Sequence, residues 1–214
     1  MREQMLHITN GDCFNDYFVE KYGEPAVPFR EAMMDGDGES PIFSDAFIRK
    51  RCEVLGISED EYRSNIGLLS LLEKKPERIC LWFGTDTFCQ MNLLTLLAYL
   101  EQIGFEGEVE LQRIDDENFA EIGEKKAVKL GLYEDLYREI LIEKKKPSAL
   151  GCLEERAVAL YFDYRSPRGF LASLIRENSD LEEMDLLCLL LGQSADYGLS
   201  DLQAQKLIRQ VRER

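Results

Sequence analysis

The stretch that decides the fold is residues 78–104, RICLWFGTDTFCQMNLLTLLAYLEQIG. Its first part, 78–83, is a short apolar run, which predicts a strand covered on both faces. A helix is predicted over 87–103, because Thr87 and Gln90 have the spacing of a capping box and a glycine follows the last apolar residue. A strand, a polar loop and a helix in this order form the repeating unit of a parallel α/β sheet.

The same pattern continues on both sides of this stretch. Further strands are predicted at 5–9, 26–29 and 108–113, and further helices at 13–22, 43–55 and 58–72. Strands that alternate with helices pair in parallel through right-handed crossovers. The predicted fold class is therefore α/β, with a Rossmann-like parallel four-stranded sheet and flanking helices in a first domain, residues 1–118.

Beyond residue 118 the strand signal disappears. Two helices are predicted within 119–146, with a break at Gly131, and others at 153–164, 167–177, 181–191 and 201–213. The last helix begins with Ser200 and Gln203 at capping-box spacing. The prediction for 119–214 is an all-helical C-terminal half packed on the α/β domain.

Composition excludes several classes of protein. The chain has 214 residues, of which 26 are basic and 41 acidic, and its formal net charge is −15. Because Lys and Arg supply the affinity for nucleic acids and anionic membranes, we expect neither as a partner. The longest apolar run is too short to span a bilayer, and the N-terminus has no signal-peptide pattern. A cytoplasmic protein is expected.

The cysteines and the histidine limit the chemistry further. Six cysteines lie far apart without a C-x-x-C pair, which excludes a zinc ribbon and a disulfide scaffold. His7 is the single histidine, so a multi-histidine zinc site is excluded. Neither a dinucleotide fingerprint nor a P-loop is present. These motifs predict no metal-ligand set, and the sequence leaves the use of Mg²⁺, the cofactor and the oligomeric state open.

Three loops that follow predicted strands contain the candidate site residues. In an open parallel sheet, ligands bind beyond the carboxyl ends of the strands, where the strand order reverses. The residues in question are Asn10, Gly11 and Asp12 in the first loop, Arg30 and Glu31 in the second, and Thr85, Asp86 and Gln90 in or just after the third. Together with His7 on the first strand, they form the predicted site.

These residue types point to particular roles. Asp12 and Asp86 are candidate acid–base groups or Mg²⁺ ligands, and His7 is a candidate proton shuttle. Arg30 is the candidate clamp for a phosphate or carboxylate, and the remaining residues would contact the ligand. Structural roles compete at each position: the aspartates as helix caps, Arg30 in an ion pair with one of them, His7 as a core residue, and Gln90 in a capping box.

Several of these residues also carry a resemblance. His7, Gly11 and Asp12 match a His-x-x-x-Gly-Asp pattern, residues 29–32 with Gly36 match Phe-Arg-Glu-Ala ahead of a glycine, and 81–90 match Leu-Trp-Phe-Glu-x-Asp-x-x-Asp-Gln. Residues 164–167 and 198–200 add two weaker matches. Over nearly its whole length the chain resembles an uncharacterised bacterial family, the domain of unknown function numbered eighteen thirty-five.

The resemblance implies the fold and the location of the site. It implies no reaction, because the family has no settled activity. Two positions depart from its pattern. Gly84 and Cys89 stand where the family tends to be acidic, which weakens a metal role at those positions.

Two functions remain open on the sequence. The first is binding of a small anionic ligand at the carboxyl edge of the sheet, with hydrolase or transferase activity. The second is a non-enzymatic protein-interaction or adaptor module with a structural ion-pair cluster. Perturbed titratable groups in a concave site would favour the first, and a fully paired sheet edge with an exposed apolar patch would favour the second.

Overall fold

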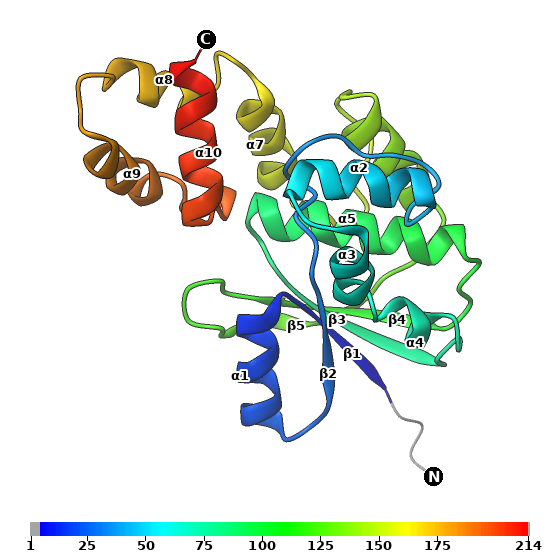
Figure 1. The fold of residues 1–214 in the computed structure, drawn as a ribbon. Helices are drawn as coiled ribbons and strands as arrows, with labels where there is room; N and C mark the ends of the chain where they lie inside the picture. Colours follow the sequence, from blue (N-terminus) through cyan, green and yellow to red (C-terminus); the bar gives the residue numbers. More distant parts are fainter. Residues whose placement is uncertain (1–4, 214) are drawn as a thin grey trace.

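The computed structural model describes residues 5–213 and has an α/β fold built on one mixed, mostly parallel sheet (Figure 1). The strand order is β2-β1-β3-β4-β5. The strands are β1, Leu6–Asn10; β2, Ala26–Phe29; β3, Arg78–Gly84; β4, Glu108–Ile114; and β5, Glu121–Ala127. The first four pair in parallel, which confirms the α/β class.

The fifth strand corrects the predicted four-stranded sheet and the predicted helices after residue 118. β5 pairs antiparallel with β4, after a turn in which the Asp115 carboxylate accepts hydrogen bonds from the backbone N–H groups of Glu117 and Asn118. All seven residues of β5 are exposed. A charged, exposed edge strand has no hydrophobic alternation, so periodicity does not detect it.

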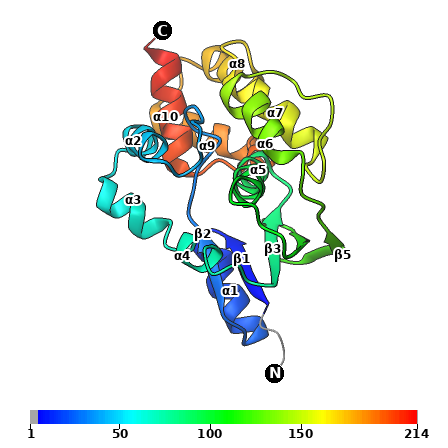
Figure 2. The ribbon, with the colours of Figure 1, turned by 90° about the vertical axis from the view of Figure 1, so that its right-hand side faces the viewer.

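Helices cover both faces of the sheet (Figures 1 and 2). On one face lies α1, Asp12–Tyr22. The other face carries α5, Thr87–Gln102, with α2, Asp45–Leu55, and two short helices, α3, Glu59–Asn65, and α4, Leu69–Leu72, where one longer helix was predicted. Successive side chains of β3 point to opposite faces of the sheet, and each face has its own hydrophobic core. Cys80 and Trp82 pack with α1 in the smaller core, while Ile79, Leu81 and Phe83 belong to the larger one.

The C-terminal helices follow β5, and the last of them begins at the predicted residue, Asp201, while the three before it begin two or three residues later than predicted. The C-terminal helices are α6, Tyr133–Tyr137, continued by a π-helical turn, Arg138–Ile142; α7, Glu155–Arg165; α8, Phe170–Glu177; α9, Glu183–Gly192; and α10, Asp201–Arg212. The predicted capping box at Ser200 and Gln203 is confirmed. In the part of the chain that the structure describes, no helix combines the length and apolar character needed to cross a membrane.

The C-terminal helices meet the sheet at the carboxyl ends of its strands. The Thr87 hydroxyl, at the start of α5, lies 3.2 Å from the backbone oxygens of Ala157 in α7 and of Asp196. Gly198, just before α10, lies directly over Asp86: a Cβ atom there would be 2.5 Å from the Asp86 Oδ1. The C-terminal half thus packs against the edge of the sheet where a site is expected.

Candidate functional site

The topology places the expected ligand crevice between β1 and β3. From β1 the chain moves to one side to form β2, and then to the other side to form β3 and β4. Such a reversal opens a crevice beyond the carboxyl ends of the two central strands. Asn10 ends β1 and Gly84 ends β3, so the loops after these residues lie at the edge where this rule places a ligand.

Three potential ligand side chains converge at this edge, and we refer to Asp86, Cys89 and Asp116 as the acidic cluster. Their ligand atoms all lie within 4.8 Å of one another. Asp86 is the N-cap of α5 and accepts a hydrogen bond from the Cys89 N–H at 2.7 Å, which brings these two residues together. Asp116 lies after the neighbouring strand, two residues beyond the end of β4.

Gly84 has no side chain, and this leaves room for the Asp116 carboxylate. A Cβ atom on Gly84 would lie 1.8 Å from the Asp116 Oδ1, so the carboxylate occupies the space that any other residue would fill. The backbone N–H of Thr85 donates to the other oxygen, Oδ2, at 3.2 Å. The end of β3 therefore holds the Asp116 carboxylate against Asp86 and Cys89.

Asn10 contacts the Cys89 thiol, and Asn92 orients Asn10. The Asn10 Nδ2 donates to the Cys89 Sγ at 2.8 Å, and the thiol donates to the Asp116 Oδ1 at 3.3 Å. The Asn92 Nδ2 donates to the Asn10 Oδ1 at 2.9 Å, which fixes the orientation of the Asn10 amide. The acidic cluster is thus surrounded by oriented polar groups, as in metal sites whose ligands are held by outer hydrogen bonds.

Burial and mutual repulsion perturb the acidic cluster. Removal from water, with the Asp116 charge as the second cause, raises the pKa of Asp86 from its ordinary 3.8 to about 7. Burial and the same two carboxylates raise the pKa of the Cys89 thiol well above its ordinary value. Asp86 and Cys89 are buried while Asp116 is exposed, so the cluster is open to solvent on the Asp116 side.

Replacing Asp86 with Asn is expected to remove a pH dependence of stability. Because the folded pKa of Asp86, about 7, exceeds the ordinary 3.8, the folded protein binds more protons than the unfolded chain between these values. The free energy of unfolding therefore falls as the pH rises through this window. Asn preserves the helix cap without the charge, so the variant should be more stable than the wild type at pH 8 by about 1–3 kcal/mol.

Chemical denaturation at pH 5 and pH 8 measures this difference. Asp45→Asn is the control: Arg63 lowers the pKa of the Asp45 carboxyl, so this charge favours the folded state at pH 8. An Asp86→Asn variant that keeps the wild-type fall in stability would show that Asp86 does not titrate in this window.

The predicted ion pair of Arg30 forms with Asp12 rather than with Asp86. The Arg30 Nε donates to the two Asp12 oxygens at 2.8 and 3.0 Å. Both side chains are exposed, 42% and 57% respectively. Asp12 opens α1 after Gly11, and no side chain caps this helix, whose first backbone N–H groups face the same edge of the sheet.

His7 lies away from the acidic cluster, on the face covered by α1. Its Nδ1 accepts a hydrogen bond from the Trp82 Nε1 at 3.1 Å, and its Nε2 lies 2.9 Å from the Glu24 Oε2. The ring also packs against Phe18, and burial lowers the pKa of the imidazole. Both ring nitrogens have partners, so the structure does not bring His7 to the other predicted residues.

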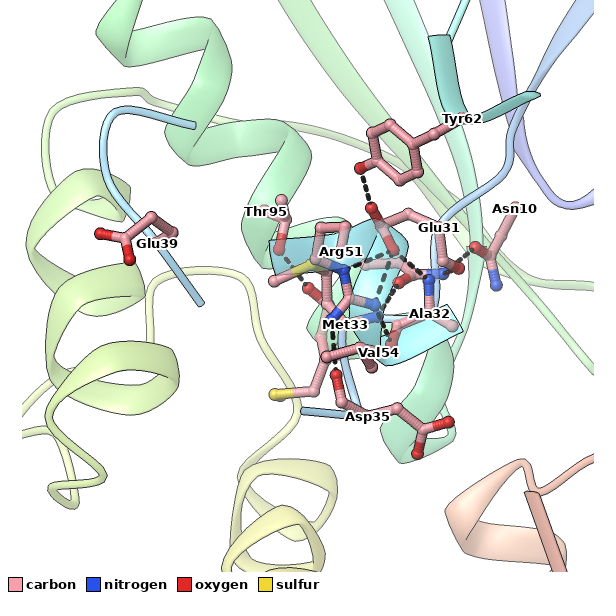
Figure 3. Close-up of polar contacts among 12 residues, drawn as sticks. Asn10, Glu31, Ala32, Met33, Asp35, Glu39, Arg51, Val54, Tyr62 and Thr95 are labelled. Carbon is pink, nitrogen blue, oxygen red and sulfur yellow. Dashed lines mark hydrogen bonds and ion pairs between the residues drawn. The ribbon is translucent and has the colours of Figure 1, made fainter. Parts of the chain in front are cut away.

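Glu31 is enclosed in the core, where it meets Arg51 and Tyr62 (Figure 3). Its Oε1 accepts from the Arg51 Nε and Nη2 at 3.1 and 2.8 Å, and its Oε2 accepts from the Tyr62 hydroxyl. The Arg51 Nη1 donates to the Asp35 carbonyl oxygen at 2.6 Å. Both charged side chains are 0% exposed, so this pair is internal structure rather than a ligand contact.

The other two predicted ligand contacts, Gln90 and Thr85, also have structural roles. Gln90 makes no capping box, because its Nε2 donates to the Gly84 carbonyl oxygen at 2.6 Å and its Oε1 accepts from the Glu154 N–H at 2.9 Å. Asp86, not Thr87, caps α5. Thr85 reaches the acidic cluster only through its backbone.

Of the residues predicted from the sequence, the structure brings Asp86 into the acidic cluster and Asn10 into contact with it, and it adds Cys89 and Asp116, which the sequence prediction did not include. A signal for Asp116 was present, since two aspartates follow the fourth predicted strand after one intervening residue, Ile114, as polar loops follow the other three. Cys89 stands three residues after Asp86 in the first helical turn, a spacing that brings side chains together.

Comparison with known proteins identifies no relative of this chain, so its function is inferred from the geometry of the site. No family model, no curated protein and no solved structure matches the chain.

Proposed function

We propose that the acidic cluster of Asp86, Cys89 and Asp116 binds a divalent cation, and that the cation holds a small anionic ligand at the carboxyl edge of the sheet. The observation that carries this proposal is the convergence of three ligand atoms within 4.8 Å, open to solvent on one side. Three protein ligands with a free position are typical of catalytic metal sites. One thiol and two carboxylates favour a transition metal such as Zn²⁺ over Mg²⁺.

The polar surroundings of the acidic cluster support the same conclusion. Asn10 donates to the thiol, and the Thr85 N–H donates to Asp116, so two of the three ligands are already oriented. The raised pKa of Asp86 reflects a shortage of positive charge, which a cation would supply in exchange for protons.

The ligand would be anionic because two further features of this edge favour negative charge. The first turn of α1 begins without a side-chain cap, and Arg30 lies beside it at the end of β2. A cation would offset the negative charge of the acidic cluster, which by itself repels anions. A cation held by Asp86, Cys89 and Asp116 would supply Lewis-acid activation of water, the chemistry of ester and anhydride hydrolysis, so we propose hydrolysis as the reaction class, with a transferase differing in the acceptor.

Binding of inorganic phosphate tests this arrangement. We expect phosphate to bind protein loaded with Zn²⁺ and not protein treated with a chelator. Arg30→Met should weaken binding to the loaded protein by about tenfold, because a charge-assisted hydrogen bond is lost. Arg63→Met removes an equally exposed arginine, paired with Asp45, and should leave phosphate binding unchanged. Equal effects of the two substitutions would remove Arg30 from the proposal.

One observation favours the second candidate, a protein-interaction module. The C-terminal helices expose large apolar side chains: Phe170 in α8 at 48%, Met184 in α9 at 67% and Leu202 in α10 at 77%. Exposed apolar side chains mark interaction surfaces when they form a contiguous patch. A protein that binds neither cation nor phosphate but associates through these helices would support this candidate instead.

A further inference from the structure

A second site candidate is a cleft of about 730 Å³ between the two halves of the chain. One wall is formed by Gly36, in the loop after β2, together with Val54 of α2; the other is formed by α8, α10 and the loop that joins α7 to α8. Figures 1 and 2 show α8 beside α10. No residue of the acidic cluster lines the cleft, so it is separate from the site proposed above.

The cleft concentrates basic side chains in an otherwise acidic chain. Arg165, Arg176 and Lys206 line it, although acidic residues outnumber basic ones by 41 to 26 over the whole sequence. The Arg176 Nη2 donates to the Ser173 Oγ at 3.3 Å, and the Lys206 Nζ donates to the Val54 carbonyl oxygen at 3.2 Å. Within residues 5–213, neither of these two cations has a carboxylate within ion-pair distance.

Two carboxylates also line the cleft, of which Asp35 is buried and Glu53 is exposed. Asp35 is 7% exposed and accepts a hydrogen bond from the Tyr164 hydroxyl at 2.9 Å. Arg165 is paired with Asp37 at 2.8 Å, which leaves Arg176 and Lys206 as the cations available to a ligand.

The lining combines further polar residues, Ser166 and Gln210, with apolar side chains. Val54, Pro167, Ala172, Leu207 and Val211 supply apolar surface. The backbone at Gly36 packs tightly against this wall: a Cβ atom there would lie 2.5 Å from a Val54 methyl carbon. A cleft with a few charged groups and apolar walls, in this range of volume, is typical of sites for small organic ligands.

We propose that this cleft binds a small organic anion, with its phosphate or carboxylate group on Arg176 and Lys206 and its apolar part against Val54 and Leu207. Two basic groups without carboxylate partners select an anionic oxygen group. The apolar walls distinguish such a ligand from a bare inorganic ion.

Calorimetric titration of the chelator-treated full chain tests the proposal, with phenyl phosphate, benzoate and inorganic phosphate as probes. The chelator removes any cation from the acidic cluster, so the outcome is independent of the function proposed there. We expect phenyl phosphate or benzoate to bind more tightly than inorganic phosphate, and the tighter of the two identifies the head group. Arg176→Ala and Lys206→Gln should each weaken that binding by about tenfold.

Arg209→Ala is the matched control, because Arg209 is an exposed cation on the same helix as Lys206 but does not line the cleft. All three side chains are exposed, so the variants are expected to fold, and their melting temperatures check this. Failure of both organic probes to bind would overturn the proposal. So would tighter binding of inorganic phosphate, or equal weakening in the control, which would indicate a diffuse charge effect.

Discussion

Replacing Arg51 with Met is expected to lower the free energy of unfolding by about 3–5 kcal/mol. The substitution leaves the Glu31 carboxylate buried without its cation, and both side chains are 0% exposed in the native protein. It also removes the donors to the carbonyl oxygens of Ala32 and Asp35. The loop after β2 would lose the contacts that hold it against α2.

Urea denaturation measures this loss, and Arg30→Met is its control. The Arg30–Asp12 pair has a similar separation, 2.8 Å, but both of its side chains are substantially exposed. An exposed pair contributes about 0–1 kcal/mol, so this variant should remain close to the wild type. Equal losses in the two variants would contradict the role assigned to burial.

The same buried pair is connected to the acidic cluster. The Asn92 Nδ2 donates to the Glu31 backbone oxygen at 2.5 Å and to the Asn10 Oδ1 at 2.9 Å. Asn10 in turn donates to the Cys89 thiol. Loss of the Arg51–Glu31 pair is therefore expected to disturb the orientation of the cluster as well as the stability of the fold.

Much of the fold was predictable because buried parallel strands have a strong sequence signal. The predicted 26–29 strand coincides with β2, and the predicted 78–83 strand differs from β3 by one residue. β5 was not predictable in this way. It has no buried apolar face, and its position is determined by backbone pairing with β4. Long-range backbone pairing leaves no local pattern.

The site was less predictable than the fold. Strand ends led to Asn10 and Asp86, because the carboxyl ends of parallel strands share one edge. Glu31 has the same position after its strand, yet it turns into the core because Arg51, twenty residues later, meets it there. The direction of a side chain in a loop depends on such partners, which no single stretch of sequence specifies.

Replacing Asp116 with Asn is expected to weaken Zn²⁺ binding by at least about 100-fold, because one of three protein ligands loses its charge. Cys89→Ser should have a comparable effect on Zn²⁺, since a hydroxyl is a poor substitute for a thiolate ligand. Asn10→Ala, which removes a donor to the Cys89 Sγ, should weaken binding by about tenfold.

Asp115→Asn is the matched control for these variants. Asp115 stands next to Asp116 and carries the same charge, but its Oδ1 accepts hydrogen bonds from two backbone N–H groups of its own turn. Asn retains an oxygen for these bonds, so Zn²⁺ affinity should stay within about twofold of the wild type, and chain-wide charge effects are excluded.

The measurement that tests the cation site most directly is calorimetric titration of Zn²⁺ into the full chain near neutral pH, repeated in buffers of different ionisation enthalpy. Exposed cysteines such as Cys13 and Cys188 are alternative Zn²⁺ ligands, but Asp116→Asn leaves them untouched. We predict one saturable site that releases protons, as expected when raised pKa values at Asp86 and Cys89 fall on binding, and that is lost in Asp116→Asn but kept in Asp115→Asn. No saturable binding, or equal binding by the two variants, would contradict the account.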